Sequence, residues 1–196
     1  MAKENTEIIW GRNLDYWFFS KELPSFNTLF VYRPNNSPPF ISLGWPGNIG
    51  AFTAISKNFG IALLTSPLKT KKWKGVPDEV FTRQIIQENK TLEEATETIM
   101  PGFLPLGRNL TLVSPHTANF VELTPSKKAV RSLSQQGYLF VTNHFQTKDL
   151  QEEQAHNFPR PRKTSIPNEF FTLEGSKVRE KKLRNLCLAK PLDVER

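Results

Sequence analysis

The sequence predicts an α+β protein in which antiparallel strands and helices occupy separate stretches of the chain. Apolar, β-branched runs fill residues 28–66, two helical patterns follow over 77–99, and strand patterns return after residue 108. Grouped strands followed by grouped helices favour α+β over a doubly wound parallel sheet. The chain of 196 residues is long enough for a real core, and we expect a single domain over 1–196.

The first strands are indicated by short apolar runs separated by turn residues. "TLFVYRP" is β-branched and aromatic, "NNSPP" is a turn, and "FISLGWPGNIGAFTAI" and "FGIALLT" supply further apolar runs broken by Gly, Pro and Asn. A meander of antiparallel strands is the simplest interpretation.

The hydrophobic period then changes to that of a helix. Pro77 stands at a first helical turn, acidic residues follow it, and an apolar stripe continues to about residue 89. Thr91 and Glu94 form a capping box, so a second helix starts at once and stops by Pro101.

Later segments repeat this alternation. "NLTLVS", "ANFVELT" and "GYLFVTN" predict strands, and the polar, proline-containing stretch 143–168 predicts a long surface loop. The charged and apolar residues of "SKVREKKLRNLCL" predict an amphipathic C-terminal helix over about 175–188.

Composition limits the function classes. The net charge of +7 arises mainly from residues 126–196, but no nucleic-acid-binding motif accompanies it, so we do not expect a nucleic-acid partner. The single cysteine and the three scattered histidines form no metal or cofactor motif, and we expect neither group. No apolar run approaches the roughly 20 residues of a membrane span, and we expect a cytoplasmic protein.

A family resemblance rests on motifs in a fixed order. "WGRNLDYWF", "GWPGNIGAFTAISKNFGIAL", "VPDEVFTRQIIQENKTLEEATETI", "NLTLVSPHTANFVELTP", "YLFVTNHF" and "SKVREKKLRNL" extend over about residues 6–188. Together they resemble the choloylglycine hydrolase and isopenicillin-N acyltransferase-like branch of the N-terminal-nucleophile (Ntn) hydrolases. The resemblance implies a four-layer αββα sandwich with antiparallel sheets, of which this chain would form a part. It also implies hydrolysis or transfer of acyl groups from linear amides, with a small-molecule amide as substrate.

In that family the nucleophile is an N-terminal Cys whose α-amino group serves as the base. The resemblance assigns Arg12 to the arginine beside the nucleophile and Asp15 to the carboxylate that holds the amine. It assigns Asn143 to the oxyanion hole and Arg179 to an arginine that closes the site in bile-salt hydrolases. A further oxyanion donor falls on Asn58, with Ser56 and Lys57 as the alternatives.

Each of these assignments has a purely structural alternative. Arg12 and Asp15 could form a structural ion pair, Asn143 could cap a turn at a strand end, and Arg179 could be a surface charge on the last helix.

The chain departs from the family at both ends. No Cys precedes Arg12, and Cys187 lies in the expected C-terminal helix without a free α-amino group. The sequence also stops soon after the "SKVRE" helix, where family members continue into further strands. We therefore expect a truncated domain that is inactive by itself. Three accounts stay open: a reading frame started or cut in the wrong place, a split or decaying gene, or a second chain that supplies the nucleophile strand, with a homo-oligomer as a further expected partner. The alternative function is a non-catalytic remnant or a binding module with a basic C-terminal surface.

Overall fold

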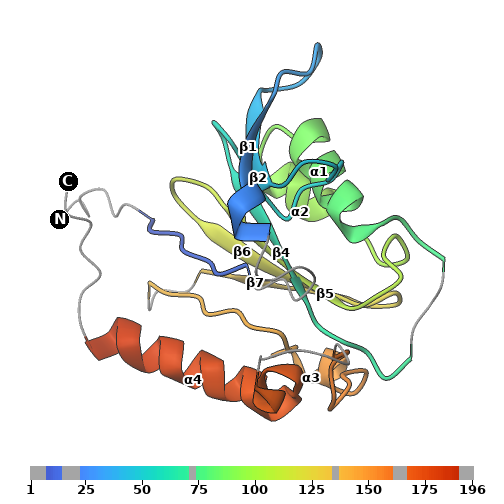
Figure 1. The fold of residues 1–196 in the computed structure, drawn as a ribbon, viewed down its shortest axis with the longest axis vertical. Helices are drawn as coiled ribbons and strands as arrows, with labels where there is room; N and C mark the ends of the chain where they lie inside the picture. Colours follow the sequence, from blue (N-terminus) through green and yellow to red (C-terminus); the bar gives the residue numbers. More distant parts are fainter. Residues whose placement is uncertain (1–7, 15–22, 71–73, 134–136, 161–166, 190–196) are drawn as a thin grey trace.

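A single meander forms the centre of the protein. The computed structural model describes residues 8–14, 23–70, 74–133, 137–160 and 167–189. Their strands form one seven-stranded antiparallel sheet in chain order, and Figure 1 labels most of these strands. The strands are β1 (Thr28–Tyr32), β2 (Phe40–Gly44), β3 (Thr53–Ser56), β4 (Gly60–Thr65), β5 (Arg108–Val113), β6 (Ala118–Leu123) and β7 (Lys128–Ser132).

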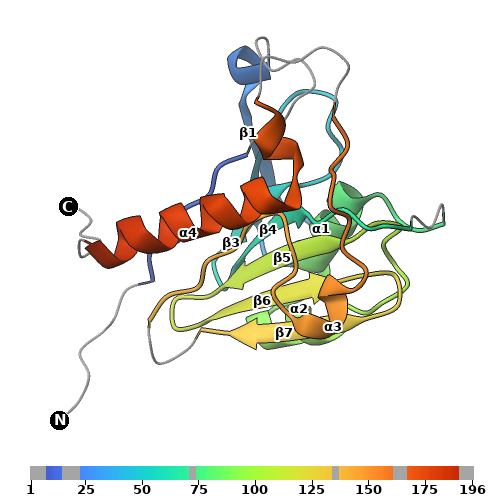
Figure 2. The ribbon, with the colours of Figure 1, turned by 90° about the horizontal axis from the view of Figure 1, so that it is seen from below.

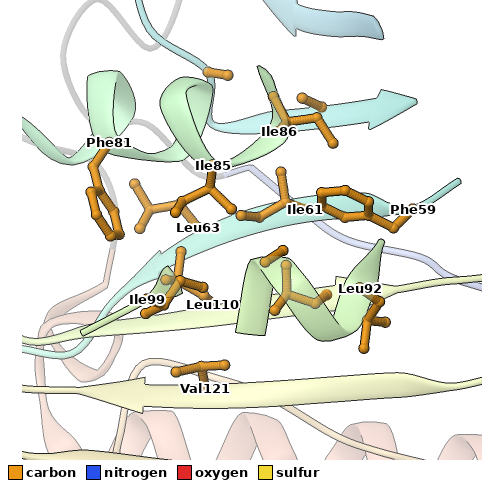
Figure 3. Close-up of a cluster of buried hydrophobic side chains, with 14 of the residues drawn as sticks. Phe59, Ile61, Leu63, Phe81, Ile85, Ile86, Leu92, Ile99, Leu110 and Val121 are labelled. Carbon is orange, nitrogen blue, oxygen red and sulfur yellow. The ribbon is translucent and has the colours of Figure 1, made fainter. Parts of the chain in front are cut away.

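Two helices between β4 and β5 cover one face of the sheet. They are α1 (Asp78–Glu88) and α2 (Leu92–Thr98), and the Thr91 hydroxyl accepts from the Glu94 amide as the capping box predicts. Their apolar stripes meet alternate residues of the central strands, and Figure 3 shows this interdigitation. The most deeply buried members include Ile61, Leu110, Val121, Ile85, Ile86 and Ile99.

The opposite face of the sheet carries a different layer. The C-terminal helix α4 (Leu173–Ala189) lies across it, and the extended stretch that begins at residue 137 runs between α4 and the sheet (Figures 1 and 2). Trp10 lies over β4, where a Cβ on Gly60 would stand 2.6 Å from the indole ring. This order of helices, sheet, extended segments and helix places α1 and α2 on one side of the molecule and α4 on the other.

Three elements differ from the sequence-based expectations. β7 was not expected, although the turn at Pro125 and the alternation in "KAVRS" are signals for a hairpin. "GYLFVTN" forms no strand in the part of the chain that is described, because no neighbouring strand lies beside it. Its backbone instead runs between α4 and the sheet.

The expected surface loop 143–168 is only partly at the surface. It holds the one-turn helix α3 (Lys148–Gln151) and ends at the 3-10 helix Asn168–Phe171. Phe145 and Leu150 are buried in an apolar cluster with Leu68. The buried Gln154 side chain accepts from the Phe145 amide and donates to the Pro67 carbonyl. Over the described ranges, no helix has the length and apolar character needed to cross a membrane.

Candidate functional site

Two predicted site residues meet at the edge of β4. β3 begins at Thr53, opposite Ala62, so β3 no longer pairs with the last residues of β4. The carbonyl of Leu63 accepts from Arg12 Nη2 at 3.2 Å, and the carbonyl of Thr65 accepts from Asn143 Nδ2 at 3.0 Å. Residues two apart on a strand are separated by about 6.6 Å, so the guanidinium and the amide lie side by side.

Arg12 is fixed by several acceptors at this edge. Its Nη1 donates to the Phe52 carbonyl and to the Thr53 hydroxyl, each at 2.7 Å. The side chain therefore holds a positive charge at the point where β3 and β4 separate. The predicted partner Asp15 lies outside the described residues, so the Arg12–Asp15 pair stays a prediction.

The orientation of the Asn143 amide follows from its two neighbours. Its Oδ1 accepts from Arg179 Nη2 at 3.1 Å, while its NH2 group donates to the Thr65 carbonyl. A cation on one side and a carbonyl on the other allow only this assignment of oxygen and nitrogen. Because the amide nitrogen carries two protons, one proton satisfies Thr65 and a second is available to a ligand.

Arg179 comes from the first half of α4, and its guanidinium stacks over the Phe170 ring at 5.0 Å. Arg179 thus contacts Asn143, although the two residues are 36 positions apart in the chain. Arg12, Asn143 and Arg179 together place two cations and one amide donor around the end of β4. Such a set can stabilise negative charge that develops on an oxygen or a sulfur.

A buried polar cluster behind Asn143 was missed from the sequence. His144 Nδ1 lies 2.9 Å from Ser176 Oγ, and His144 Nε2 lies 3.1 Å from Glu180 Oε2. Burial lowers the pKa of His144 below its ordinary value, against the opposing effect of Glu180; Lys177 lowers this pKa further, and Glu122 raises it. The ring is therefore neutral around pH 7. The i, i+4 spacing of Ser176 and Glu180 on the predicted helix was the available signal.

Comparisons with known proteins decide the family. A sequence model described as acyl-coenzyme A:6-aminopenicillanic acid acyl-transferase matches residues 1–166. The chain belongs to this acyltransferase family. This confirms the resemblance to the Ntn hydrolases of the choloylglycine hydrolase type.

A solved structure supports the fold. The chain is similar to a Caenorhabditis elegans N-acylethanolamine-hydrolyzing acid amidase ortholog, with a TM-score of 0.56 and 15% sequence identity. The match covers 72% of this chain and 67% of that chain. No curated protein sequence gives a significant match. The α+β class and the antiparallel sheet are thus those of an Ntn hydrolase.

Asn58 lies apart from the other predicted residues of the acyltransferase-family site. It precedes β4, and its Nδ2 donates to the Lys90 carbonyl between α1 and α2 at 2.6 Å. Thr65, which contacts Asn143, stands at the far end of the same strand. The seven intervening steps correspond to roughly 20 Å of extended chain. The structure therefore does not bring Asn58 to the Arg12–Asn143–Arg179 cluster, and its contacts are those of a loop brace.

The thiol of Cys187 also lies apart. Cys187 is in α4, eight residues beyond Arg179, which corresponds to about 12 Å along the helix axis. Within the described ranges, no group of three or more His, Cys, Asp and Glu side chains could hold a metal ion.

A cavity of about 290 Å³ adjoins the site at Thr65. Arg108 is its charged member, but the guanidinium already donates to the Asp78 carboxylate and to the Gly107 carbonyl. Most of the other lining side chains are apolar, among them Pro67, Leu68, Leu106, Phe158 and Pro159. The cavity thus suits a neutral, largely apolar group next to the polar cluster.

Proposed function

We propose that this chain forms the oxyanion and substrate-binding side of an Ntn-type C–N hydrolase or acyltransferase acting on linear amides. The observation that carries the proposal is the joint placement of Arg12, Asn143 and Arg179 at the end of β4. The second amide proton of Asn143 would donate to the substrate carbonyl oxygen. Donors of this kind are typically worth about 10²- to 10³-fold in rate.

The chemical step requires a thiol that residues 1–196 do not place at the site. In the proposed step a thiolate attacks the amide carbon, the C–N bond breaks, and the amine leaves with a proton. Water or a second amine then releases the acyl group from the thioester. Arg12 would favour the thiolate, because an adjacent cation lowers the pKa of a thiol.

The cavity beside Thr65 would take an apolar group of the amide. Its wall residues Leu68 and Leu106 are apolar, and the charged lining residue Arg108 is paired with Asp78. A small-molecule amide with a neutral, apolar acyl or amine part therefore fits best. This proposal follows from the cavity and from the acyl chemistry of the family.

The decisive experiment compares two forms of the protein in the same amide-hydrolysis assay. We expect residues 1–196 alone to give no turnover, because their only thiol is Cys187. The protein isolated from its source should be examined for its intact mass and N-terminal residue. A form that carries an N-terminal Cys, on this chain or on an associated one, should release the amine and lose activity on thiol alkylation.

The role of Asn143 is then tested in the active form. Asn143→Asp should lower kcat by about 10²- to 10³-fold, because a carboxylate cannot donate to the oxyanion. Asn36→Asp, in the exposed turn between β1 and β2, is the matched control. An active form in which both variants retain full turnover would contradict the proposal.

A non-catalytic binding module is the second candidate. Exposed lysines on α4, including Lys177, Lys181 and Lys182, favour contact with an acidic partner. Source protein without an N-terminal Cys on any associated chain, and with no turnover, would support this second candidate.

A further inference from the structure

The segment that carries Asn143 is held from behind by a buried chain of polar groups. The neighbours of Asn143, Thr142 and His144, are both buried, and both contact Ser176 of α4. Asn143 itself contacts Thr65 and Arg179 instead. The residues on either side of Asn143 thus attach the segment to α4, while Asn143 faces the end of β4.

The hydrogen bonds of this chain can all be satisfied in one direction. Thr142 Oγ1 donates to the Ser176 carbonyl at 3.2 Å, and Ser176 Oγ donates to His144 Nδ1 at 2.9 Å. His144 Nε2–H then donates to Glu180 at 3.1 Å, and Glu180 also accepts from Arg184 at 3.1 Å. A neutral His144 with its proton on Nε2 completes the network, since each group then has its partner.

The backbone on both sides of Asn143 is fixed as well. Asn109 of β5 donates from Nδ2 to the Thr142 carbonyl at 2.9 Å and to the His144 carbonyl at 3.0 Å. Asn109 is fully buried. The sheet therefore fixes the main chain of this segment, and the His144 ring fixes its distance from α4, which also carries Arg179.

The contacts run from Ser176 to His144 to Glu180, as in a catalytic triad of nucleophile, base and acid, but the arrangement does not suit catalysis. Ser176 has no exposed surface and lies in the first turn of α4. A substrate carbonyl cannot reach its Oγ without unfolding that turn. The cluster therefore acts on the position of its neighbours.

We propose that His144 is a positioning residue that joins the Asn143 segment to α4 and so sets the Asn143 amide between Thr65 and Arg179. The proposal rests on the proposed function for the catalytic use of Asn143, but the geometry it describes can be measured without turnover. Loss of the ring nitrogens would remove the His144 contacts to Ser176 Oγ and to Glu180, and Thr142 would be left as the contact of this segment with Ser176. The Asn143 amide would then lose its fixed orientation.

The test uses NMR of the 15N-labelled chain of residues 1–196. The two side-chain NH signals of Asn143 are assigned by their disappearance in Asn143→Asp. His144→Phe keeps a ring of similar size and removes both nitrogens; we expect the Asn143 pair to shift toward the positions of exposed Asn side chains. His116→Phe, in the exposed turn between β5 and β6, is the matched control and should leave the pair in place. A folded His144→Phe protein with an unshifted Asn143 pair would overturn the proposal.

Milder variants decide the case in which His144→Phe does not fold. Ser176→Ala removes a hydroxyl that contacts both Nδ1 and the Thr142 hydroxyl, and Glu180→Gln replaces the carboxylate that contacts Nε2 and Arg184 by a neutral amide. At least one of them should shift the Asn143 pair in the same direction. Unshifted signals in both variants would overturn the proposal.

A pH titration that follows the Asn143 side-chain NH signals tests the positioning role separately from a general contribution of His144 to stability. The groups that face the His144 ring are Glu180 and Lys177 on α4 and Glu122 on β6. We expect the Asn143 side-chain pair to move with the same midpoint as the His144 ring signals in the wild-type chain. An Asn143 pair that ignores the titration of His144 counts against the proposal.

Failure of this inference can be distinguished from failure of the proposed function. Shifted Asn143 signals in a protein that never hydrolyses an amide would leave the positioning role intact and remove the catalytic one. In an active form, His144→Phe should lower kcat more than it changes KM, because Asn143 acts on the developing oxyanion. Where Asn143→Asp has lowered kcat, an equal turnover number in His144→Phe would overturn the positioning role alone.

Discussion

The two halves of the sheet face opposite α1 and α2 are built from different chemistry. Over β5 to β7, side chains such as Asn109 and Glu122 are fully buried and bond the segment from residue 142 to 147. Over β1 to β3, the same face presents apolar side chains to solvent, with Leu29 59% and Leu43 45% exposed. The candidate site lies at the boundary, where β3 stops pairing with β4.

Covering a face of the sheet and fixing one arrangement of the covering segment are therefore separate properties in this fold. Polar groups on the β5–β7 half accept only one arrangement of the covering segment, since each buried group needs its own partner. Apolar groups on the β1–β3 half accept any apolar cover. A fixed site is therefore placed against the polar half.

The largest loss of unfolding free energy should follow from replacing Glu122 on the polar half of the sheet. Its carboxylate accepts from the amides of Gln146 and Thr147 and from the Thr147 hydroxyl, with no exposed surface. Glu122→Leu leaves these donors without acceptors, at about 1–3 kcal/mol each, and we expect a loss of roughly 3–5 kcal/mol. Urea unfolding measures the change. Glu152→Leu, at an exposed position, is the control and should change stability by less than about 0.5 kcal/mol.

A smaller loss of unfolding free energy should follow from Asn109→Ala. Two backbone carbonyls, those of Thr142 and His144, lose their donor, and the small cavity left behind adds to the cost. We expect about 2–3 kcal/mol by urea unfolding, together with faster hydrogen exchange in the segment around Asn143. An unchanged exchange rate there would show that Asn109 does not hold the segment.

The pH dependence of stability should also come from this half. Burial lowers the pKa of His144. Below about pH 6.5, His144 therefore binds a proton in the unfolded chain more readily than in the folded chain. The His144 contribution is fully present above that pH and is lost as the pH falls toward the folded pKa. Urea unfolding between pH 7.5 and 5 should show this decline. His144→Gln should flatten it, whereas His116→Gln should not.

The sequence predicted what local chemistry determines. The capping box at Thr91 and the strand runs of β1 to β6 are encoded within a few residues, and the motifs around Arg12, Asn143 and Arg179 identified residues that the structure brings together. Asn58 was assigned to the site from its position in a family motif. The structure places it at the opposite end of β4 from Thr65, and this placement depends on the direction of the strand. The His144 cluster joins residues 32 positions apart, which only the packing of α4 reveals.

The smallest effect on stability, and the clearest effect on association, should come from the apolar half. Leu29 and Leu43 are cross-strand partners on β1 and β2, and Val31 and Ile41 form the next pair on the same face. The double variant Leu29→Thr, Leu43→Thr introduces β-branched strand formers and removes exposed apolar area, so the unfolding free energy should change by less than about 1 kcal/mol. We expect a second copy of the chain to cover this face at high protein concentration, because apolar patches of this kind favour association. Sedimentation velocity should then show wild-type self-association that the double variant weakens. Equal sedimentation of both proteins would show that the apolar half is not a contact between copies.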